Sequence, residues 1–316
     1  MAKQADITKG VSIIVPTFKR PKGLRVALES LMGQRAGELT LEIIVADNDP
    51  KASARHYVTD FSKTSAIKIH YIHVPQPGVS NARNAALKAA KGRYLAFLDD
   101  DQEAGKNWLE TLVRIAGKYG AGLSFVPTYA RIHGKSIYDK YLVDFFSRYG
   151  PALEEGVLSI FFGCGNSLLD TKLCTLPTPP FSLDMNETGG EDDLLFGALL
   201  DQGIKIAWSR AAVCYEDILP HRATPEYIKV RSFSFGQSPS QECADGNKPF
   251  GIVKWMFIGA AQYAVHKPLS IFTKLAKRPS YIKHLAKAAE GAGKVVWFSG
   301  FTPKLYGAAV VENKAF

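Results

Sequence analysis

The sequence predicts an α/β fold: a mostly parallel sheet with flanking helices, followed by a basic, helical C-terminal region. Two observations predict the sheet: apolar, β-rich runs alternate with helical patterns over residues 11–98, and each run ends in turn or polar residues. The charge distribution sets the C-terminal region apart. Residues 250–316 hold ten Lys and Arg against two Asp and Glu, whereas residues 1–249 hold 29 against 28.

Four strands and three helices are expected before residue 100. The strand runs are continuously apolar, which is typical of parallel strands buried on both faces. We expect strands at Val11–Pro16, Leu41–Ala46, Ile67–Val74 and Arg93–Leu98, and helices at Pro21–Met32, Lys51–Ser62 and Asn81–Gly92. Ligands of such sheets bind at the carboxyl ends of the strands.

The following residues are expected to continue with mixed structure. Helices are predicted at Asn107–Tyr119 and Gly189–Gly203, strands at Gly122–Tyr129 and Ile204–Trp208, mixed β structure around a glycine-rich turn at Gly156–Leu169, and a proline-rich loop at Thr171–Ser182. Residues 236–249 are polar and punctuated by Gly and Pro, which indicates a linker.

Composition excludes several classes of protein. With 316 residues, 46% hydrophobic and 22% charged, the chain is neither disordered nor collagenous nor a disulfide scaffold. Its four cysteines lie 10, 40 and 29 positions apart, without the spacing of a zinc knuckle or a thioredoxin-like motif. No apolar run follows the N-terminal lysines, and none reaches the roughly 18 to 20 residues of a spanning helix. We therefore expect a cytoplasmic protein with reduced thiols.

Three consecutive aspartates, Asp99, Asp100 and Asp101, follow an expected strand. Such a triplet needs a positive partner, and a divalent cation is the simplest one. In extended backbone Asp99 and Asp101 point to the same side, and Mg²⁺ or Mn²⁺ binds carboxylate oxygens while keeping positions for water and phosphate oxygens. The alternative is a solvated acidic turn that caps the next helix.

A second acidic cluster, Glu191, Asp192 and Asp193, opens an expected helix. One of these carboxylates is a candidate general base that takes a proton from an attacking hydroxyl. The alternative is simple capping, because carboxylates interact well with the positive end of the helix dipole. Asp192 and Asp193 differ by about 100° around a helix, so only one can face an acceptor well.

Further polar residues follow the expected strands. Arg83 lies in the first turn of a helix that begins near Ser80 or Asn81, an arrangement that suits a diphosphate, although such an Arg is more often solvated. Thr17, Lys19 and Arg20 follow the first strand, and Asp47 and Asp49 follow the second. The topology thus predicts a pocket at this edge of the sheet.

In this order, the runs VSIIVPTFKRP, LEIIVADND, GVSNARNAALKAAKGRYLAFLDDD and GGEDDLLF resemble the family 2 glycosyltransferases of the GT-A fold, over Val11–Gly203. The VADND, LAFLDDD, GGED and SGFTPKLYG stretches favour the branch of bacterial exopolysaccharide glucosyltransferases of the succinoglycan type. The resemblance implies a Rossmann-like nucleotide-diphospho-sugar transferase domain over residues 1–235. Its nucleotide-binding half is 10–101 and its acceptor-binding half 102–235, followed by the linker 236–249 and a membrane-associating region 250–316.

The resemblance also implies roles for individual residues. The nucleotide-sugar site would comprise Pro16, Thr17, Arg20, Asp47 (on the base, usually uracil), Asp49, Arg83 (near the diphosphate), Asp99 and Asp100 (facing the sugar or ribose). Asp99 and Asp101 would be the ends of the DXD motif, with Asp101 favoured as the direct metal ligand. Asp192 would be the catalytic base, supported by Glu191, with Asp193 as the alternative. Ala46 stands where a second acid often precedes Asp47.

Four residues are weaker candidates. Gly165 and Asn166 belong to a GCGN turn that either shapes the acceptor or sugar wall or is only a tight turn. His221 and Arg222 are either near the mouth of the site or ordinary surface and packing residues.

The implied activity is an inverting, Mg²⁺- or Mn²⁺-dependent transfer of a hexose from a UDP-sugar to a saccharide acceptor linked to polyprenyl diphosphate. The enzyme would act at the cytoplasmic face of the inner membrane. Alternatives are a nucleotidyltransferase on a similar sheet and a non-catalytic sugar-nucleotide or membrane-binding subunit. The basic region, in which Lys alternates with aromatic residues, favours an anionic membrane surface. It could instead pack on the catalytic domain, and nucleic-acid binding is not expected.

Overall fold

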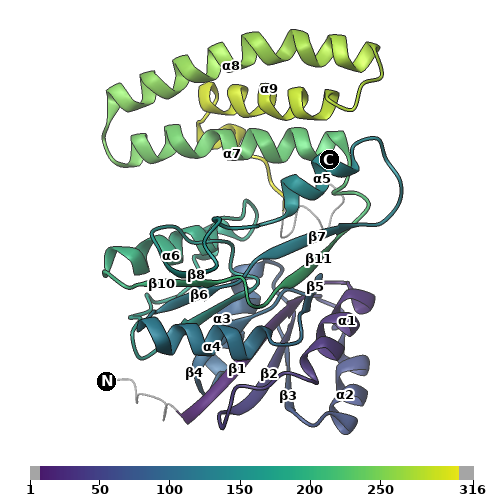
Figure 1. Cartoon of the computed structure of the whole chain (residues 1–316), viewed down its shortest axis with the longest axis vertical. Coiled ribbons are helices and arrows are strands. Elements are labelled where there is room, and N and C mark those ends of the chain that lie inside the picture. Colours follow the sequence, from purple (N-terminus) through teal and green to yellow (C-terminus); the bar gives the residue numbers. More distant parts are fainter. Residues whose placement is uncertain (1–7, 306–316) are drawn as a thin grey trace. The chain divides into compact units, whose positions relative to one another are not determined.

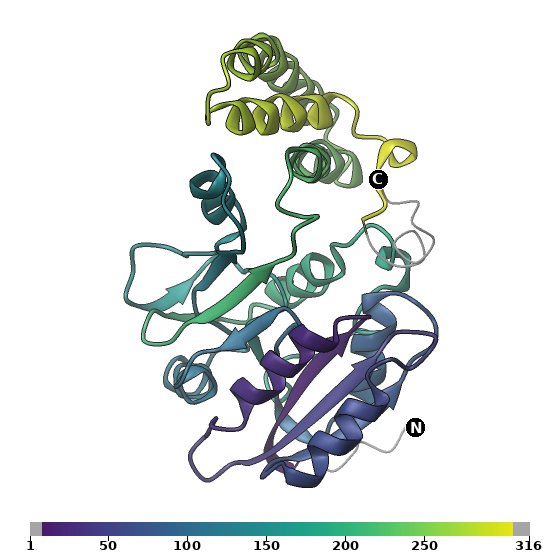
Figure 2. The same ribbon diagram turned by 90° about the vertical axis from the view of Figure 1, so that its right-hand side faces the viewer.

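The computed structural model describes residues 8–305, which form two compact units (Figures 1 and 2). Within the described residues, the first unit comprises residues 8–129, residues 147–217 and Leu305. The second unit, called here the helical unit, comprises residues 130–146 and 218–304. The chain therefore leaves the first unit twice, and the helical unit includes a short excursion that the sequence analysis did not separate.

The first unit is built on an eight-stranded sheet with the order β3-β2-β1-β4-β9-β6-β10-β8. Its strands are β1 (Thr8–Thr17), β2 (Thr40–Asp47), β3 (Lys68–His73), β4 (Gly92–Phe97), β6 (Leu123–Phe125), β8 (Glu155–Leu158), β9 (Ser167–Asp170) and β10 (Ile206–Ser209). Strands β1–β4 pair in parallel, as do β6 and β10. Strand β9 is antiparallel to β4 and β6, and β8 to β10. The sheet is mostly parallel, as predicted.

A smaller sheet has the order β5-β11-β7. Its strands are β5 (Gln102–Ala104), β7 (Thr128–Ile132) and β11 (Cys214–Ile218). The single strand expected over residues 122–129 is thus two strands, β6 and β7. Pro127 lies between them and has no N–H to donate to a ladder, so the run cannot continue as one internal strand.

Helices cover both faces of the large sheet. The helices of this unit are α1 (Pro21–Leu31), α2 (Arg55–Thr64), α3 (Val79–Ala89), α4 (Trp108–Tyr119) and α6 (Glu191–Asp201), with a 3₁₀ turn at Leu183–Met185. One apolar core joins α1, α2 and α4 to the sheet, and another joins α3 and α6. In β1, Ile13 and Val15 enter the first core and Ile14 the second. This two-sided burial explains the continuous apolar run.

The order of the strands makes β1 the point at which the sheet reverses its direction of growth. The chain runs outward from β1 to β2 and β3, then returns to place β4 on the other side of β1. At such a switch point the connections after neighbouring strands diverge and leave room for a ligand at their carboxyl ends. Thr17 ends β1, and the aspartate triplet follows β4.

The helical unit contains α5 (Asp139–Phe146), α7 (Pro225–Asp245), α8 (Pro249–Leu275), α9 (Tyr281–Val295) and a 3₁₀ turn at Ser299–Phe301. Helix α9 packs against both α7 and α8 (Figure 1). The expected linker 236–249 is helical as far as Asp245, because its polar side chains bond within this bundle. Gln237 donates to the carbonyl of Val296 at 2.9 Å, and Ser240 to that of Lys294 at 2.8 Å. Residues 306–316 of the predicted membrane-associating region lie outside the described residues.

Glycines allow the three long helices to approach closely. A Cβ on Gly236 of α7 would lie 2.1 Å from the carbonyl oxygen of Glu290 in α9. A Cβ on Gly259 of α8 would lie 2.5 Å from the carbonyl oxygen of Gly291 in α9. Backbone atoms cannot move aside as the end of a flexible side chain can, so these positions require glycine.

We predict that Gly236→Ala destabilises the helical unit by about 1–3 kcal/mol, because the added methyl group forces α7 away from α9. Calorimetric unfolding would measure the change. Gly117→Ala in α4 is the matched control, since its Cβ would meet nothing within 4 Å. That variant should be neutral or more stable by up to about 1 kcal/mol. Equal stability of the two variants would contradict the close-packing argument.

Candidate active site

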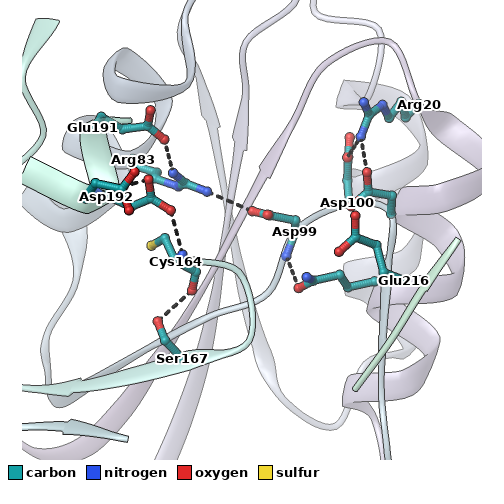
Figure 3. A network of polar contacts seen from close by, with 12 residues as sticks. Arg20, Arg83, Asp99, Asp100, Cys164, Ser167, Glu191, Asp192 and Glu216 are labelled. Carbon is teal, nitrogen blue, oxygen red and sulfur yellow. Dashed lines mark hydrogen bonds and ion pairs between the residues drawn. The ribbon is translucent and has the colours of Figure 1, made fainter. Parts of the chain in front are cut away.

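The acidic clusters and Arg83 meet in the first unit, at the carboxyl end of β4 and the start of α6 (Figure 3). Five segments contribute: the loop after β1, the first turns of α3, the aspartate triplet after β4, the turn before β9, and the first turn of α6. These segments are far apart in sequence. The sheet topology brings them to one edge, as the sequence analysis expected for most of them.

Arg83 lies at the centre of the network. Its guanidinium donates to Glu191 and, at 3.0 Å, to Asp99, so it joins the start of α6 to the end of β4. The guanidinium also lies over the ring of Phe181, 5.5 Å from the centroid, and its side chain is 5% exposed. Burial raises the pKa of Glu191, and the attraction of Arg83 opposes that rise. Arg83 is therefore a buried bridge between the two acidic clusters rather than a solvated side chain.

Asp100 joins the ends of β1 and β4. Its buried carboxylate accepts from the hydroxyl of Thr17 at 2.8 Å, from the N–H of Phe18 at 3.2 Å, and from Arg20 at 2.9 Å. Burial raises the pKa of Asp100, and the charge of Arg20 counters that effect. Arg20 also bonds Asp101 at 2.7 Å. In this structure, then, Asp100 faces the loop after β1.

The two candidate bases on α6 differ in their surroundings. Asp192 is half-buried, and its Oδ2 accepts from the N–H of Cys164 at 2.8 Å. That contact places its carboxylate beside the glycine-rich turn before β9, where a Cβ on Gly163 would lie 3.5 Å from it. Asp193 is exposed. The geometry therefore favours Asp192 over Asp193 as the residue that faces the site.

Asp47 organises the loop after β2. Its carboxylate accepts from the N–H groups of Asp49 at 3.0 Å and Ala54 at 2.9 Å, and from the hydroxyl of Tyr71 at 2.8 Å. Asp49 in turn accepts from the N–H of Lys51 at 3.1 Å. Both aspartates are buried. These bonds shape the loop, and the N–H of Asn48 donates to the carbonyl of Thr17 at 2.8 Å, which holds the loop beside the end of β1.

Of the weaker candidates, Gly165 and Asn166 lie in the site. A Cβ on Gly165 would lie 2.3 Å from Oδ2 of Asp99, so this turn can approach the aspartate only because it lacks a side chain. Asn166 is a buried structural residue that accepts from the indole N–H of Trp108 at 2.7 Å and donates to the carbonyl of Val126 at 2.7 Å. Its φ of 70° lies in the left-handed region that asparagine tolerates.

The remaining predicted residues have other positions. Pro16 is buried in β1 and pairs with Ala46 of β2. His221 and Arg222 belong to the helical unit, where the guanidinium of Arg222 lies over the rings of Phe146 and Tyr227.

The carboxylates fit a hard divalent cation. One oxygen of Asp99 accepts from Arg83, and the side chain is 32% exposed, so it keeps access to solvent. No group of three or more His, Cys, Asp or Glu within residues 8–305 could hold a metal alone. Mg²⁺ does not require such a group, because it binds through one or two carboxylates together with water and substrate phosphates. Of the two expected ligands, Asp99 keeps this access, whereas the side chain of Asp101 is 9% exposed and bonds Arg20.

Sequence reasoning missed three contacts. The N–H of Cys164 holds Asp192, Gln102 accepts from the N–H of Asp99 at 3.1 Å, and Trp108 anchors the GCGN turn through Asn166. The first contact uses a backbone group, which leaves no trace in residue type. The other two depend on how β5 and α4 pack, and residue spacing does not reveal that.

The chain is similar in sequence to several known proteins. Residues 12–173 match the family model Glycosyl transferase family 2. The chain is 32% identical over 241 residues to succinoglycan biosynthesis protein ExoM of Rhizobium meliloti, covering 75% of this chain and 76% of that protein. It is 30% identical over 171 residues to WfgD of Escherichia coli, a UDP-Glc:alpha-D-GlcNAc-diphosphoundecaprenol beta-1,3-glucosyltransferase, covering 54% of this chain and 64% of that protein.

Among solved structures, S. aureus TarS 1–349 in complex with UDP aligns with 17% identity and a TM-score of 0.49, covering 90% of both chains. The family model matches half of the chain, and the resemblance to ExoM extends over three quarters of both proteins. The chain therefore belongs to glycosyl transferase family 2 and has the GT-A fold that its sequence predicted.

Proposed function

We propose that this protein is an inverting hexosyltransferase of bacterial exopolysaccharide or cell-surface polysaccharide biosynthesis. It transfers a sugar, glucose or a related hexose, from a UDP-sugar to a hydroxyl of a saccharide linked to polyprenyl diphosphate. The observation that carries the proposal is the pairing of Arg83 with both Asp99 and Glu191. It holds Asp99, on the proposed side of the sugar donor, and the first turn of α6 in one site. A binding module would not require a half-buried carboxylate, Asp192, beside that bridge.

Asp192 is the proposed general base. Its carboxylate is oriented by the N–H of Cys164, which leaves other lone pairs to accept the proton of an acceptor hydroxyl. The activated oxygen attacks the anomeric carbon on the face opposite the diphosphate, so a single displacement inverts the configuration. Glu191 supports this step by holding the helix start to Arg83.

The leaving diphosphate gains negative charge as its bond to the sugar breaks. Arg83 and Arg20 are the cations of the network, and fixed positive charge in a site of low dielectric stabilises such a group. Asp99 and Asp101 would hold Mg²⁺ or Mn²⁺, which when bound supplies further stabilisation of that charge.

The loops after β1 and β2 are the proposed nucleotide site. Pro16, Thr17 and Arg20 form the first loop, which Asp100 ties to the strand end. Asp47 and Asp49 form the second, where the buried Asp47 organises the loop that receives the base. The proposed roles of Asp47 and Asp100 thus include holding these loops in place for the nucleotide.

The proposed acceptor and location draw support from the relatives. WfgD is named for a diphosphoundecaprenol acceptor and ExoM for succinoglycan biosynthesis. An acceptor of that kind is anchored in a membrane, so the protein would work as a peripheral enzyme on the cytoplasmic face. No helix within the described residues is long and apolar enough to cross a bilayer.

Asp192→Asn should lower kcat about 100- to 10,000-fold, because the amide cannot take the acceptor proton, while UDP-sugar affinity changes little. Release of UDP measures turnover, and calorimetric titration with the donor measures affinity. The matched control is Asp193→Asn, whose side chain is exposed and should matter only a few-fold. If Asp193→Asn is the inactive variant, the base has been assigned to the wrong residue; if neither variant loses activity, the protein is not acting as a transferase through α6.

Arg83→Met should lower the free energy of unfolding by about 3–5 kcal/mol, because it leaves Glu191 buried without its cation. Adding Glu191→Gln should recover much of that stability without restoring turnover. Denaturant titration and UDP release measure the two effects. Arg114→Met is the control: it breaks a more exposed pair with Glu155 and should cost at most about 1 kcal/mol. Full turnover in the double variant would refute a catalytic role for the bridge.

A donor panel tests the reaction itself. Purified protein would be assayed with UDP-, GDP-, CDP- and dTDP-sugars and a bacterial lipid-linked acceptor extract, with Mn²⁺, Mg²⁺ or EDTA. We expect release of UDP that rises with the extract and stops in EDTA, because the diphosphate then lacks its counter-charge. Activity unaffected by EDTA would contradict the metal role. UDP-sugar binding without turnover on any acceptor would instead favour a non-catalytic subunit.

A further inference from the structure

Helix α8 exposes a row of large apolar side chains. Phe250 is 90% exposed, Phe257 77% and Leu275 79%. The other large apolar residues exposed on this helix are Val253, Tyr263, Val265, Leu269, Ile271 and Phe272. Single exposed apolar residues are normal, but a continuous row along one helix marks an interaction site.

Most of this row lies on one side of the helix. At about 100° per residue, all members of the row except Tyr263 and Leu269, together with the exposed alanines and Pro268, fall within an arc of about 140°. The members of that arc are Phe250, Val253, Phe257, Ala260, Ala261, Ala264, Val265, Pro268, Ile271, Phe272 and Leu275. We call these residues the outer face of α8. Lys254 is the one charged residue within the arc, and Lys267 and Lys274 border it.

The fully buried residues of α8 are small or polar. The buried residues of the helix are Gly259, Ser270 and Thr273, on the side away from the outer face. Gly259 contacts the backbone of α9 closely, which fixes the rotation of the helix. The fully buried residues of α8 are thus glycine and hydroxyl-bearing residues, and Ile252, Trp255 and Met256 on the same side are half-buried. The most exposed large residues of the helix are phenylalanine and leucine, on the outer face.

The charge around the outer face has one sign. Between Asp245 and Glu290 the chain carries eight Lys and Arg and no Asp or Glu. In a symmetric dimer formed through this face, the same lysines would meet one another across the interface. An anionic surface would neutralise them instead. The charge therefore favours anionic lipid over a second copy of the chain as the partner.

We propose that α8 lies in the plane of an anionic membrane interface, with its outer face in the acyl boundary and its lysines at the headgroups. The sequence analysis assigned membrane association to the whole of residues 250–316, whereas this inference confines it to one face of one helix. Helix α9, whose glycines and alanines are buried in the bundle, supports α8 rather than contacting lipid. The inference builds on the proposed function, because a lipid-linked acceptor lies at this boundary.

Vesicle flotation tests lipid binding by the outer face of α8 without donor, acceptor or turnover. A negative result would therefore contradict this inference without contradicting the proposed function. The full chain should float with vesicles that contain phosphatidylglycerol and much less with pure phosphatidylcholine. Phe250→Glu with Phe257→Glu should reduce binding at least about tenfold, since each phenylalanine loses its apolar burial. Lys254→Gln, Lys267→Gln and Lys274→Gln together should reduce binding to anionic vesicles and remove the preference over phosphatidylcholine.

The matched control is Ile137→Glu, which changes an exposed apolar residue (57% exposed) of the helical unit outside α8. It should bind vesicles as the unchanged protein does. Circular dichroism and the melting temperature would show that each variant is folded. The proposal is overturned if the unchanged protein does not float or if Ile137→Glu is as defective as the α8 variants. It is also overturned if light scattering shows a dimer that the phenylalanine variants dissociate, because the face would then be a self-interface.

Discussion

The charge of one buried guanidinium, that of Arg83, is the constraint on which the candidate site depends. Glu191 begins α6, Asp99 follows β4, and both would repel each other if brought together without a cation. Arg83 removes that repulsion. The two carboxylates in turn offset the free-energy cost of burying the charge of its guanidinium. Removing one partner of such a group leaves an uncompensated buried charge, which costs about 3–5 kcal/mol. The position of Asp192, one residue after Glu191, follows from this bridge, so the electrostatics of the network set the geometry of the proposed base.

A second arginine completes the account of the aspartate triplet. Three adjacent carboxylates need positive charge, and a divalent cation is its simplest source from the sequence alone. In the structure Arg20 pairs with Asp100 and Asp101, and Arg83 pairs with Asp99. The triplet is therefore supported by the protein before any cation binds. This does not compete with a metal, because a carboxylate offers about four lone-pair positions. It means that the donor and its cation would enter a site whose strand ends are already held in place.

The sequence predicted what depends on local pattern and failed where long-range contacts decide. Strands buried on both faces leave continuous apolar runs, so β1, β2 and β4 could be recognised, and topology then placed Thr17 beside the aspartate triplet. The linker expected at 236–249 was a different case. Its Gln and Ser residues bond to carbonyls more than fifty positions away, which composition cannot reveal. Likewise, the choice between Asp192 and Asp193 depends on which of the two carboxylates the rotation of α6 turns toward the N–H of Cys164, and the sequence does not reveal that rotation.

Helix α8 packs differently from the helices of the first unit, called here the sheet unit, and from α5, α7 and α9, which share an apolar core. In the sheet unit, large apolar side chains fill the space between layers, and their burial supplies the stability. Helix α8 meets α9 through the close backbone approach of Gly259 and Gly291 and through the side chains of Gln262 and His266. Close packing through small residues is the means by which helices associate in lipid, where burying large apolar groups against each other has no advantage. The phenylalanines of the outer face are stable in contact with acyl chains and costly to expose to water. The packing of α8 through small residues and the apolar outer face therefore indicate the same environment, a lipid interface.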